Sequence, residues 1–181
     1  MNFIVILSII YLIIPAVIAN TMPVFVKKYF KKLNYPIDFY KKINGKRILG
    51  DNKTFRGFIF GILGSIIIVL LQKILSNYIL FSKISLIDYS RINILLFGFL
   101  IGFFVLLFDS IASFIKRRLN FKPGESFFIL DQINGGIGFV FTIYFYLNSF
   151  NIILFSLIIW FLGHFLIKYL GYLFEIDKNK I

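Results

Sequence analysis

The chain has 181 residues, of which 59% are hydrophobic, and its mean hydropathy is +0.88. Soluble domains are normally about half apolar, so this composition excludes a soluble globular protein and indicates an integral membrane protein. The net charge of +12 is clustered between apolar segments, which argues against a nucleic-acid ligand. No cysteine is present, which excludes disulfide bonds and thiolate metal ligands.

Five apolar runs are each close to the roughly 20 residues that a helix needs to cross a membrane. They predict an all-α integral membrane fold in which residues 1–181 form a single transmembrane domain. The first run has no basic segment before it and no clear cleavage site after it, so we expect a retained helix rather than a signal peptide. The predicted spans lie near residues 2–25, 57–80, 92–114, 127–147 and 151–174.

The distribution of basic residues predicts the orientation of these spans. Seventeen of the 20 Lys and Arg residues lie in the loop 26–56, in the loop 115–126 or near the C-terminus. Only Lys73, Lys83 and Arg91 lie on the opposite side. Because short cytoplasmic loops are enriched in Lys and Arg, we expect the N-terminus outside, the C-terminus in the cytoplasm and both basic loops in the cytoplasm. The same charges attract anionic membrane lipids.

The first basic loop contains the segment GKRILGDNKTFRG, residues 45–57, in which three glycines separate charged side chains. Such a segment can bend tightly and direct several donors at one anion. It does not match the Walker pattern, and the alternative is a solvated loop whose charges only set orientation. The glycine spacing favours a phosphate-binding role. The charged residues of the segment are Lys46, Arg47, Asp51, Lys53 and Arg56.

Two features within the spans indicate packing rather than chemistry. The second and third spans each contain a GxxxG pattern, Gly57 to Gly61 and Gly98 to Gly102, and this pattern lets helices approach closely. We expect these glycines to pack helices within one molecule. His164 has no second ligand at metal-binding spacing, so we interpret it, with Trp160, as a packing residue.

Two carboxylates lie at membrane depth on either side of the second basic loop. Asp109 is near the end of the third span and Asp131 near the start of the fourth, and Pro123-Gly124 marks the turn between them. A charged side chain at the centre of a membrane helix costs about 2.5–3.5 kcal/mol, so such residues usually have a partner and a function. In a tight helical hairpin both carboxylates would lie within about 10 Å of the cytoplasmic boundary.

Helical spacing groups other polar residues with these carboxylates. Asp109, Ser113 and Lys116 or Arg117 share one helix face, and Asp131 shares a face with Asn134. Oxygen ligands of this kind suit Mg²⁺, and nearby cations can offset the charge of a triphosphate. Phosphoryl and nucleotidyl transfer need positioning and charge stabilisation, without a Ser–His or Cys–His pair. An interhelical salt bridge is the structural alternative for either aspartate alone.

Two sequence blocks resemble those of the short CDP-archaeol synthase family, which is related to the phosphatidate cytidylyltransferases. The first block is Pro36-Ile37-Asp38 followed by the glycine-separated segment up to Gly57. The second runs from Asp109 through the SFIKRR segment to Leu130-Asp131-Gln132. In two positions the chain departs from the family pattern: Phe108 stands where a glycine usually precedes the first aspartate, and Asn134 replaces an acidic residue.

The resemblance implies five membrane helices and transfer of CMP from CTP to a lipid phosphate, with release of pyrophosphate and with Mg²⁺ as cofactor. In the archaeal branch the lipid is unsaturated archaetidic acid, which carries two geranylgeranyl ether chains, and the product is CDP-archaeol. We therefore expect a multi-pass cell-membrane enzyme with its active site on the cytoplasmic side. Its expected partners are CTP, the lipid phosphate and membrane lipids, and the oligomeric state is not predicted.

The resemblance also suggests roles for individual residues. We expect Asp109 and Asp131 to hold Mg²⁺ with Asn134 as a further ligand, and Lys116 and Arg117 to act beside them in catalysis. Asp38 and Glu125 are secondary candidates, because acidic loop residues are often only solvated. The residues expected to bind the nucleotide or its phosphates are Lys46, Arg47, Asp51, Lys53, Thr54, Arg56, Ser113 and Lys122.

Three other functions fit parts of the sequence. A phosphatidate cytidylyltransferase would use the same residues on ester-linked lipids, because the apolar spans do not specify the lipid chains. A small cation transporter would use the two aspartates as a relay, but it would need polar residues through the whole membrane, and the fifth span is nearly all apolar. A non-catalytic scaffold would not require the glycine-separated basic loop.

Overall fold

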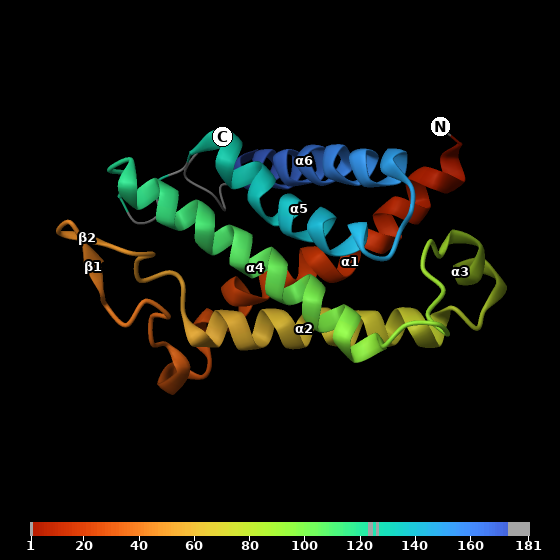
Figure 1. Cartoon of the computed structure of the whole chain (residues 1–181), viewed down its shortest axis with the longest axis horizontal. Coiled ribbons are helices and arrows are strands. Elements are labelled where there is room, and N and C mark those ends of the chain that lie inside the picture. The colour runs from red at the N-terminus through yellow and green to blue at the C-terminus, as the bar shows by residue number, and fades with distance from the viewer. Residues whose placement is uncertain (1, 123–124, 126, 174–181) are drawn as a thin grey trace.

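The computed structural model describes the chain except for residues 1, 123–124, 126 and 174–181. The described part is almost entirely helical, with one short β-hairpin (Figure 1). The predicted turn at Pro123-Gly124 lies outside the described residues. The elements are α1 (Phe3–Phe25), η1 (Val26–Lys28), η2 (Lys31–Leu33), β1 (Lys42–Ile43), β2 (Lys46–Arg47), α2 (Phe55–Leu75), α3 (Ile79–Ile84), α4 (Ile94–Arg118), α5 (Phe128–Tyr144) and α6 (Phe150–Leu173).

The long helices coincide with the five predicted apolar runs, and the all-helical membrane fold is confirmed. By length and composition, α1, α2 and α4 can each cross a membrane. Helix α5 has 17 residues, and the shorter apolar helix in α6 covers Phe150–Leu166, so a count of five spans stays a prediction. The second run also ends earlier than predicted: α2 stops at Leu75, and a separate short helix, α3, begins at Ile79.

Local sequence determines where α2 and α4 begin and favours the place where α4 ends. Helix α2 begins after Thr54, whose Oγ1 accepts a hydrogen bond from the Gly57 amide at 3.2 Å. Helix α4 begins after Asn93, whose Oδ1 accepts from the Leu96 amide at 3.0 Å. These are N-cap bonds, which satisfy amides that have no partner within the helix. The last turn of α4 carries Lys116, Arg117 and Arg118, where cations interact favourably with the helix dipole.

Helix α4 lies diagonally across the bundle between α2 and α5 (Figure 1). It packs so closely on α2 that a Cβ atom at Gly98 would lie 2.7 Å from the Ile66 Cα, and one at Gly102 would lie 2.8 Å from the Ile62 Cα. Real side chains do not approach backbone atoms this closely, so only glycine fits at these two positions. The GxxxG pattern of the third span therefore serves packing within the molecule, as predicted.

The first basic loop forms a β-hairpin at one end of the bundle, while α3 lies at the other end (Figure 1). Lys42 pairs with Arg47 and Ile43 with Lys46 in an antiparallel register. The turn between them is Asn44-Gly45, and both residues have positive φ angles of 51° and 75°. Asn-Gly is the dipeptide that two-residue hairpin turns favour, so this turn carries a hairpin signal that the predictions above did not include.

Candidate active site

Asp109 stands on α4, two and a half turns before the helix ends, and meets residues from two other segments. Its Oδ2 forms an ion pair with Nζ of Lys53, which lies in the loop before α2. Its Oδ1 accepts a hydrogen bond from Nδ2 of Asn134 on α5 at 3.2 Å. The side chain of Asp109 remains 24% exposed, so a ligand can reach it.

Asp131 occupies the first turn of α5 and has a separate cation. Its Oδ1 lies 2.6 Å from Nζ of Lys116 on α4, and its Oδ2 accepts from the Phe127 amide at 2.9 Å. A carboxylate in this position is stabilised by the N-terminal end of the helix dipole. Like Asp109, its side chain is partly accessible, with 23% of its surface exposed.

The structure brings the two carboxylates onto facing helices, as predicted from the short loop between the two spans. Asn134 follows Asp131 by less than one helical turn and itself contacts Asp109, so both aspartates lie on the α4–α5 interface. Each one is paired with a lysine from a different segment. The interhelical ion pair that the sequence offered as an alternative is therefore present for Lys116–Asp131, within the same cluster.

Arg47, one of the predicted phosphate ligands, instead organises its own loop. Its guanidinium binds Asp38 through Nη2 at 2.7 Å and Nε at 3.2 Å, and its Nη1 lies 2.6 Å from Asp51. The buried Asp38 carboxylate also accepts hydrogen bonds from the amides of Leu49 at 3.0 Å and Gly50 at 3.1 Å. Asp38, a secondary candidate by sequence, thus holds three residues of the glycine-separated segment in place.

These contacts change the pKa values of Asp38 and Arg47. Burial by itself would raise the pKa of Asp38, but the hydrogen bonds from Arg47, Leu49 and Gly50 outweigh it and lower the pKa from 3.8 to about 2. The same pair raises the pKa of Arg47, chiefly through its hydrogen bond to Asp38. The loop therefore contains a carboxylate that stays ionised at any pH where the protein would normally operate.

Arg56 also holds backbone structure. The residue is 4% exposed, and its guanidinium donates to the Tyr29 carbonyl at 3.0 Å and to Oδ1 of Asn34 at 2.9 Å. These bonds fix the segment after α1 against the start of α2. The expectation that Arg56 grips a triphosphate is not supported by this position, because its donors face the loop rather than the two carboxylates.

The end of α4 joins the two basic loops. Arg118 donates to the carbonyls of Ile43 at 2.8 Å, Lys46 at 3.2 Å and Arg47 at 2.6 Å, so it holds the hairpin against the helix. Lys46 returns a bond from Nζ to the Arg118 carbonyl at 3.4 Å. No role was predicted for Arg118, because contacts between residues more than 70 positions apart leave no local pattern in the sequence.

Arg117, predicted to act in catalysis, is buried and donates to the Phe121 carbonyl. Its Nε also lies beside Gly50, where a Cβ atom would be 3.6 Å away. Gly50 has a φ of 99°, a conformation that residues with a side chain rarely adopt. Arg117 therefore supports the turn after α4 and the loop containing Gly50, and does not contact either aspartate through a described bond.

Three further predicted residues make contacts within their own helix or loop. Ser113 is buried and donates to the Asp109 carbonyl at 3.1 Å within α4. Thr54 is the N-cap of α2. Lys122 is exposed, and its backbone amide donates to Oε2 of Glu125 at 2.7 Å. Of the predicted set, the structure therefore brings together five side chains at the α4–α5 interface: Asp109, Asp131, Asn134, Lys53 and Lys116.

The carboxylate oxygens at this interface suit Mg²⁺ as ligands, both in type and in number. Within the described residues, no group of three or more His, Cys, Asp or Glu side chains could hold a metal ion. Mg²⁺ does not need such a cage, because it is usually held by one or two carboxylates and completes its shell with water and substrate phosphate. The two partly exposed carboxylates meet that requirement, and Asn134 contacts one of them through Nδ2.

A family model for CarS-like CDP-archaeol synthases matches residues 2–180. The chain belongs to this family. The CDP-archaeol synthase of Archaeoglobus fulgidus is 37% identical over 133 residues, covering 71% of this chain and 68% of the relative. That of Pyrococcus furiosus is 39% identical over 128 residues, covering 70% and 68%. The resemblance inferred from the two sequence blocks is therefore confirmed.

The matched segment is only part of each relative. The CDP-archaeol synthase of Thermofilum pendens is 34% identical over 125 residues, which are 67% of this chain and 54% of that protein. The chain thus spans little more than half of this relative. A solved structure described as an intramembrane enzyme for archaeal membrane lipids biosynthesis has a TM-score of 0.69 and 25% identity, covering 87% of this chain and 90% of that one. The multi-pass membrane fold is shared along nearly the whole length of both.

Proposed function

We propose that this protein is a CDP-archaeol synthase, which transfers CMP from CTP to a lipid phosphate with isoprenoid ether chains. Family membership supports the reaction class. The observation that carries the proposal is the pair of aspartates, each paired with a lysine, on facing helices. Such a cluster, partly exposed and beside two basic loops, suits a polyphosphate substrate that meets a lipid headgroup.

Asp109 and Asp131 are the proposed Mg²⁺ ligands, with Asn134, which donates from Nδ2 to Asp109, as the proposed further ligand. The Asn134 Oδ1 accepts from the Gly135 amide, so the side-chain amide would have to turn for this oxygen to reach a metal ion. Mg²⁺ bound there would offset the negative charge of the phosphates. The uncharged Asn134 in place of an acidic residue reduces the negative charge of the ligand set, as expected from sequence.

Lys53 and Lys116 are the proposed phosphate ligands of the site. Each ammonium group already lies beside the carboxylates and is largely shielded, with 18% and 12% of the side chain exposed. An ammonium group has three rotatable donors and can turn from a carboxylate to a phosphate oxygen. Charge-assisted bonds of this kind would hold the triphosphate in one orientation.

The proposed chemical step is an in-line displacement at the α-phosphorus of CTP. An oxygen of the lipid phosphate attacks the α-phosphorus. The bond between the α-phosphorus and the oxygen that bridges it to the β-phosphorus breaks, and pyrophosphate leaves with the bonding electrons. The lipid phosphate oxygen is already ionised near neutral pH, so no side chain needs to remove a proton. The protein contributes mainly alignment and charge stabilisation.

We further propose a single transmembrane domain of five spans, with the N-terminus outside and the active site at the cytoplasmic face. The charge distribution supports this orientation, because the hairpin loop and the end of α4 carry most of the basic residues. A helix of 17 residues rises about 26 Å, slightly less than the roughly 30 Å hydrocarbon core. Because α5 is shorter than the hydrocarbon core, Asp131 in its first turn would lie at the boundary between the hydrocarbon and the polar headgroups.

The test uses the purified protein in bilayer nanodiscs with CTP labelled at the α-phosphorus. Archaetidic acid with geranylgeranyl ether chains is compared with ester-linked phosphatidic acid, each with Mg²⁺ and with a chelator. We expect labelled CDP-lipid only with Mg²⁺, and faster formation from the ether lipid. Faster turnover of phosphatidic acid would instead assign the ester-lipid activity, and no labelled lipid from either substrate would contradict the proposal.

A further inference from the structure

The segment between α1 and the hairpin, residues 26–40, exposes aromatic rings and lysines side by side. It contains four lysines and one acidic residue, Asp38, whose carboxylate is buried against Arg47. Rings gathered in one place on a surface mark a contact with another molecule or with a membrane. Five aromatic residues of the segment are each 45–65% exposed: Tyr29, Phe30, Tyr35, Phe39 and Tyr40.

The backbone holds three of these rings at the surface in an uncommon conformation. Phe30, Phe39 and Tyr40 have positive φ angles of 50°, 50° and 59°, which bulky residues rarely adopt. Hydrogen bonds fix two of them: the Phe39 amide donates to the Pro36 carbonyl at 3.1 Å, and the Tyr40 amide donates to Oδ1 of Asp38 at 3.1 Å. Such a conformation persists only where surrounding contacts enforce it, so the exposure of these rings is built into the loop.

The rings continue the exposed side of α2. Phe30 packs on Phe60 with ring centroids 4.5 Å apart, and Phe39 packs edge-to-face on Phe55, the first residue of α2, at 5.5 Å. Phe55 and Ile59, one helical turn apart, are both exposed. Helix α2 is long and apolar enough to cross a membrane, so this side of it faces hydrocarbon. The segment lies beside the first turns of α2 (Figure 1), where the span would meet the headgroup layer.

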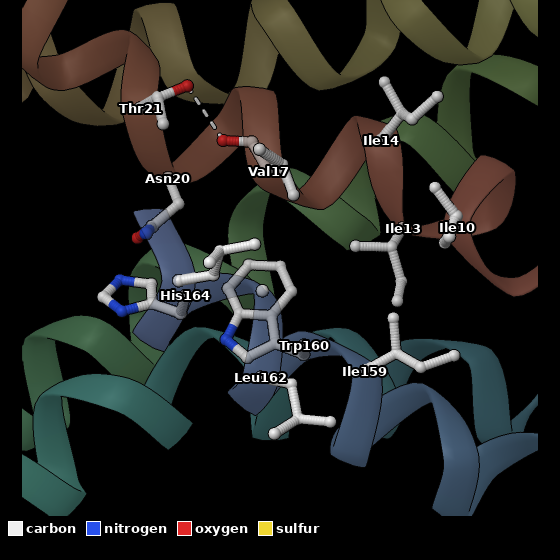
Figure 2. A pocket seen from close by; sticks show the side chains of 12 residues that line it. Ile10, Ile13, Ile14, Val17, Asn20, Thr21, Ile159, Trp160, Leu162 and His164 are labelled. Carbon is white, nitrogen blue, oxygen red and sulfur yellow. Dashed lines mark hydrogen bonds between the residues drawn. The ribbon is translucent and has the colours of Figure 1, made fainter. Parts of the chain in front are cut away.

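A second apolar feature of the surface has a different chemistry. A groove of about 530 Å³ between α1 and α6 has mostly apolar walls, with Asn20, Thr21 and His164 at one end (Figure 2). Among the described residues, no Lys or Arg lines this groove. The segment 26–40 differs from it because positive charge lies beside its apolar surface. That combination attracts anionic headgroups while the rings enter the layer between the headgroups and the hydrocarbon.

We propose that this segment is an interfacial surface, which binds the anionic headgroup layer of the membrane leaflet nearest the candidate active site. The interfacial surface consists of the five rings together with the exposed lysines Lys27, Lys31 and Lys32. The lysine stems lie along apolar surface and place their ammonium groups at the lipid phosphates. Tyrosine suits the same layer, because its ring is apolar and its hydroxyl is polar.

The interfacial surface is joined directly to a residue of the candidate active site. The Ile37 amide donates to the Lys53 carbonyl at 2.9 Å, and the Phe55 amide donates to the Tyr35 carbonyl at 3.0 Å. Lys53 in turn forms the ion pair with Asp109. A membrane contact that fixes this segment therefore also fixes the position of Lys53 beside Asp109. The membrane contact itself does not depend on the proposed function, whereas an effect on CTP binding rests on it.

Because the chain has no cysteine, a single spin label can report the depth of the interfacial surface in the membrane. Leu33→Cys places a label at an exposed position within the segment, and Asn44→Cys places one at the hairpin turn, which stands away from the helices in Figure 1. Both labelled proteins are reconstituted in phosphatidylcholine nanodiscs with and without phosphatidylglycerol. With phosphatidylglycerol, the label at position 33 should collide with a water-soluble nickel chelate at least about threefold less often than the label at position 44.

The contribution of the lysines is tested in the same discs. Lys27→Gln combined with Lys31→Gln should raise the collisions at position 33 by about threefold, because each lysine near an anionic surface strengthens the contact. Lys83→Gln, at an exposed position of α3 at the other end of the bundle, is the matched control and should change nothing. Equal collisions at positions 33 and 44 would overturn the proposal and leave the surface to a water-soluble partner. Equal protection without phosphatidylglycerol would overturn the assignment to anionic headgroups.

The link to Lys53 is tested by enzyme kinetics. Phe30→Ser combined with Phe39→Ser removes two rings without changing the charge, and it should raise the KM for CTP by about fivefold in discs with phosphatidylglycerol. In discs of phosphatidylcholine alone this variant and the wild type should have the same KM, because neither then meets an anionic layer. Ile43→Ser, at an exposed hairpin position outside the interfacial surface, is the matched control and should keep the wild-type KM in both discs.

Two kinetic outcomes would overturn the link to Lys53 while the proposed function stands. One is an unchanged KM in the double Phe variant although the label at position 33 is protected. The other is an equal rise in KM in both kinds of disc, which would mean that the rings only hold the loop together. If the wild type formed no labelled CDP-lipid, the proposed function would fail, and the label measurements would still decide whether the segment binds the membrane.

Discussion

Two sets of cations lie around the end of α4, and they differ in what they bind. The lysines of the cluster, Lys53 and Lys116, each pair with one partly exposed carboxylate. The arginines nearby bind backbone carbonyls or a buried carboxylate, as Arg118 and Arg47 do. A guanidinium presents five donors in a fixed plane and suits several static acceptors, whereas an ammonium group can exchange partners. The comparison agrees with the proposal that the lysines bind the substrate, while the arginines hold the loops around them.

The largest expected effect concerns the carboxylate partner of Lys116. Asp131→Asn should reduce CMP transfer by at least about a hundredfold, because it removes the charge of a proposed Mg²⁺ ligand. An Asn Oδ1 can still accept from the Phe127 amide, so the start of α5 should be preserved. Turnover is measured with labelled CTP, and the unfolding midpoint serves as the control. Activity near that of the wild type would remove Asp131 from the site.

Next in size is the loss of Lys53, a proposed phosphate ligand. Lys53→Gln should raise the KM for CTP by about 10- to 100-fold, since a hydrogen bond to a charged group contributes about 1.5–3 kcal/mol. Lys41→Gln, at an exposed position in the same loop, is the matched control and should leave the KM unchanged. Equal effects of the two substitutions would mean that Lys53 contributes only general positive charge.

The arginine side of the comparison predicts a different readout. Arg118→Gln loses most of the bonds to three carbonyls of the hairpin and should destabilise that loop by about 1–3 kcal/mol. We expect hydrogen exchange in residues 42–47 to increase, while the KM for CTP rises by less than about threefold. Arg91→Gln, which alters an exposed ion pair with Asp88, should change neither. A tenfold loss of CTP affinity without faster exchange would assign Arg118 to the substrate.

The smallest effect near neutral pH concerns Asp38. Its pKa is about 2 in the folded protein and 3.8 in its ordinary state, so its ionised form stabilises the loop above about pH 4. This contribution is lost as the pH falls from about 4 to 2, because protonation then breaks the bonds to Arg47. Hydrogen exchange of the Leu49 and Gly50 amides should increase over that range. Asp38→Asn should show fast exchange at every pH, and identical pH profiles would contradict the assignment.

The helices and the aspartate pair could be predicted because their signals are local. Apolar runs of about 20 residues predict the long helices, and a short loop between two of them makes α4 and α5 neighbours. The roles of the arginines could not be predicted in this way. Arg47, Arg56 and Arg117 lie in the expected blocks, but spacing does not reveal whether a guanidinium faces a phosphate or a carbonyl brought close by folding. Lys53 meets Asp109 from 56 positions away, and that contact depends on how the loop packs on α4.

The boundaries of the spans show the same limit. The second predicted span extends to residue 80, but α2 ends at Leu75, and Ser76, Asn77 and Tyr78 form a turn. Hydropathy measures how apolar a segment is and does not report where the backbone changes direction. The Asn44-Gly45 turn is the converse case, because its sequence signal was present and the surrounding charges drew the interpretation elsewhere.

The most direct test of the account is CMP transfer from labelled CTP by Asp109→Asn, in nanodiscs with Mg²⁺ and geranylgeranyl archaetidic acid. Asp109 links Lys53 of one loop to Asn134 of α5, so it is the residue at which the cluster converges. The account predicts a loss of at least about a hundredfold in turnover with an unfolding midpoint close to that of the wild type. Turnover equal to that of the wild type, in a folded variant, would contradict it.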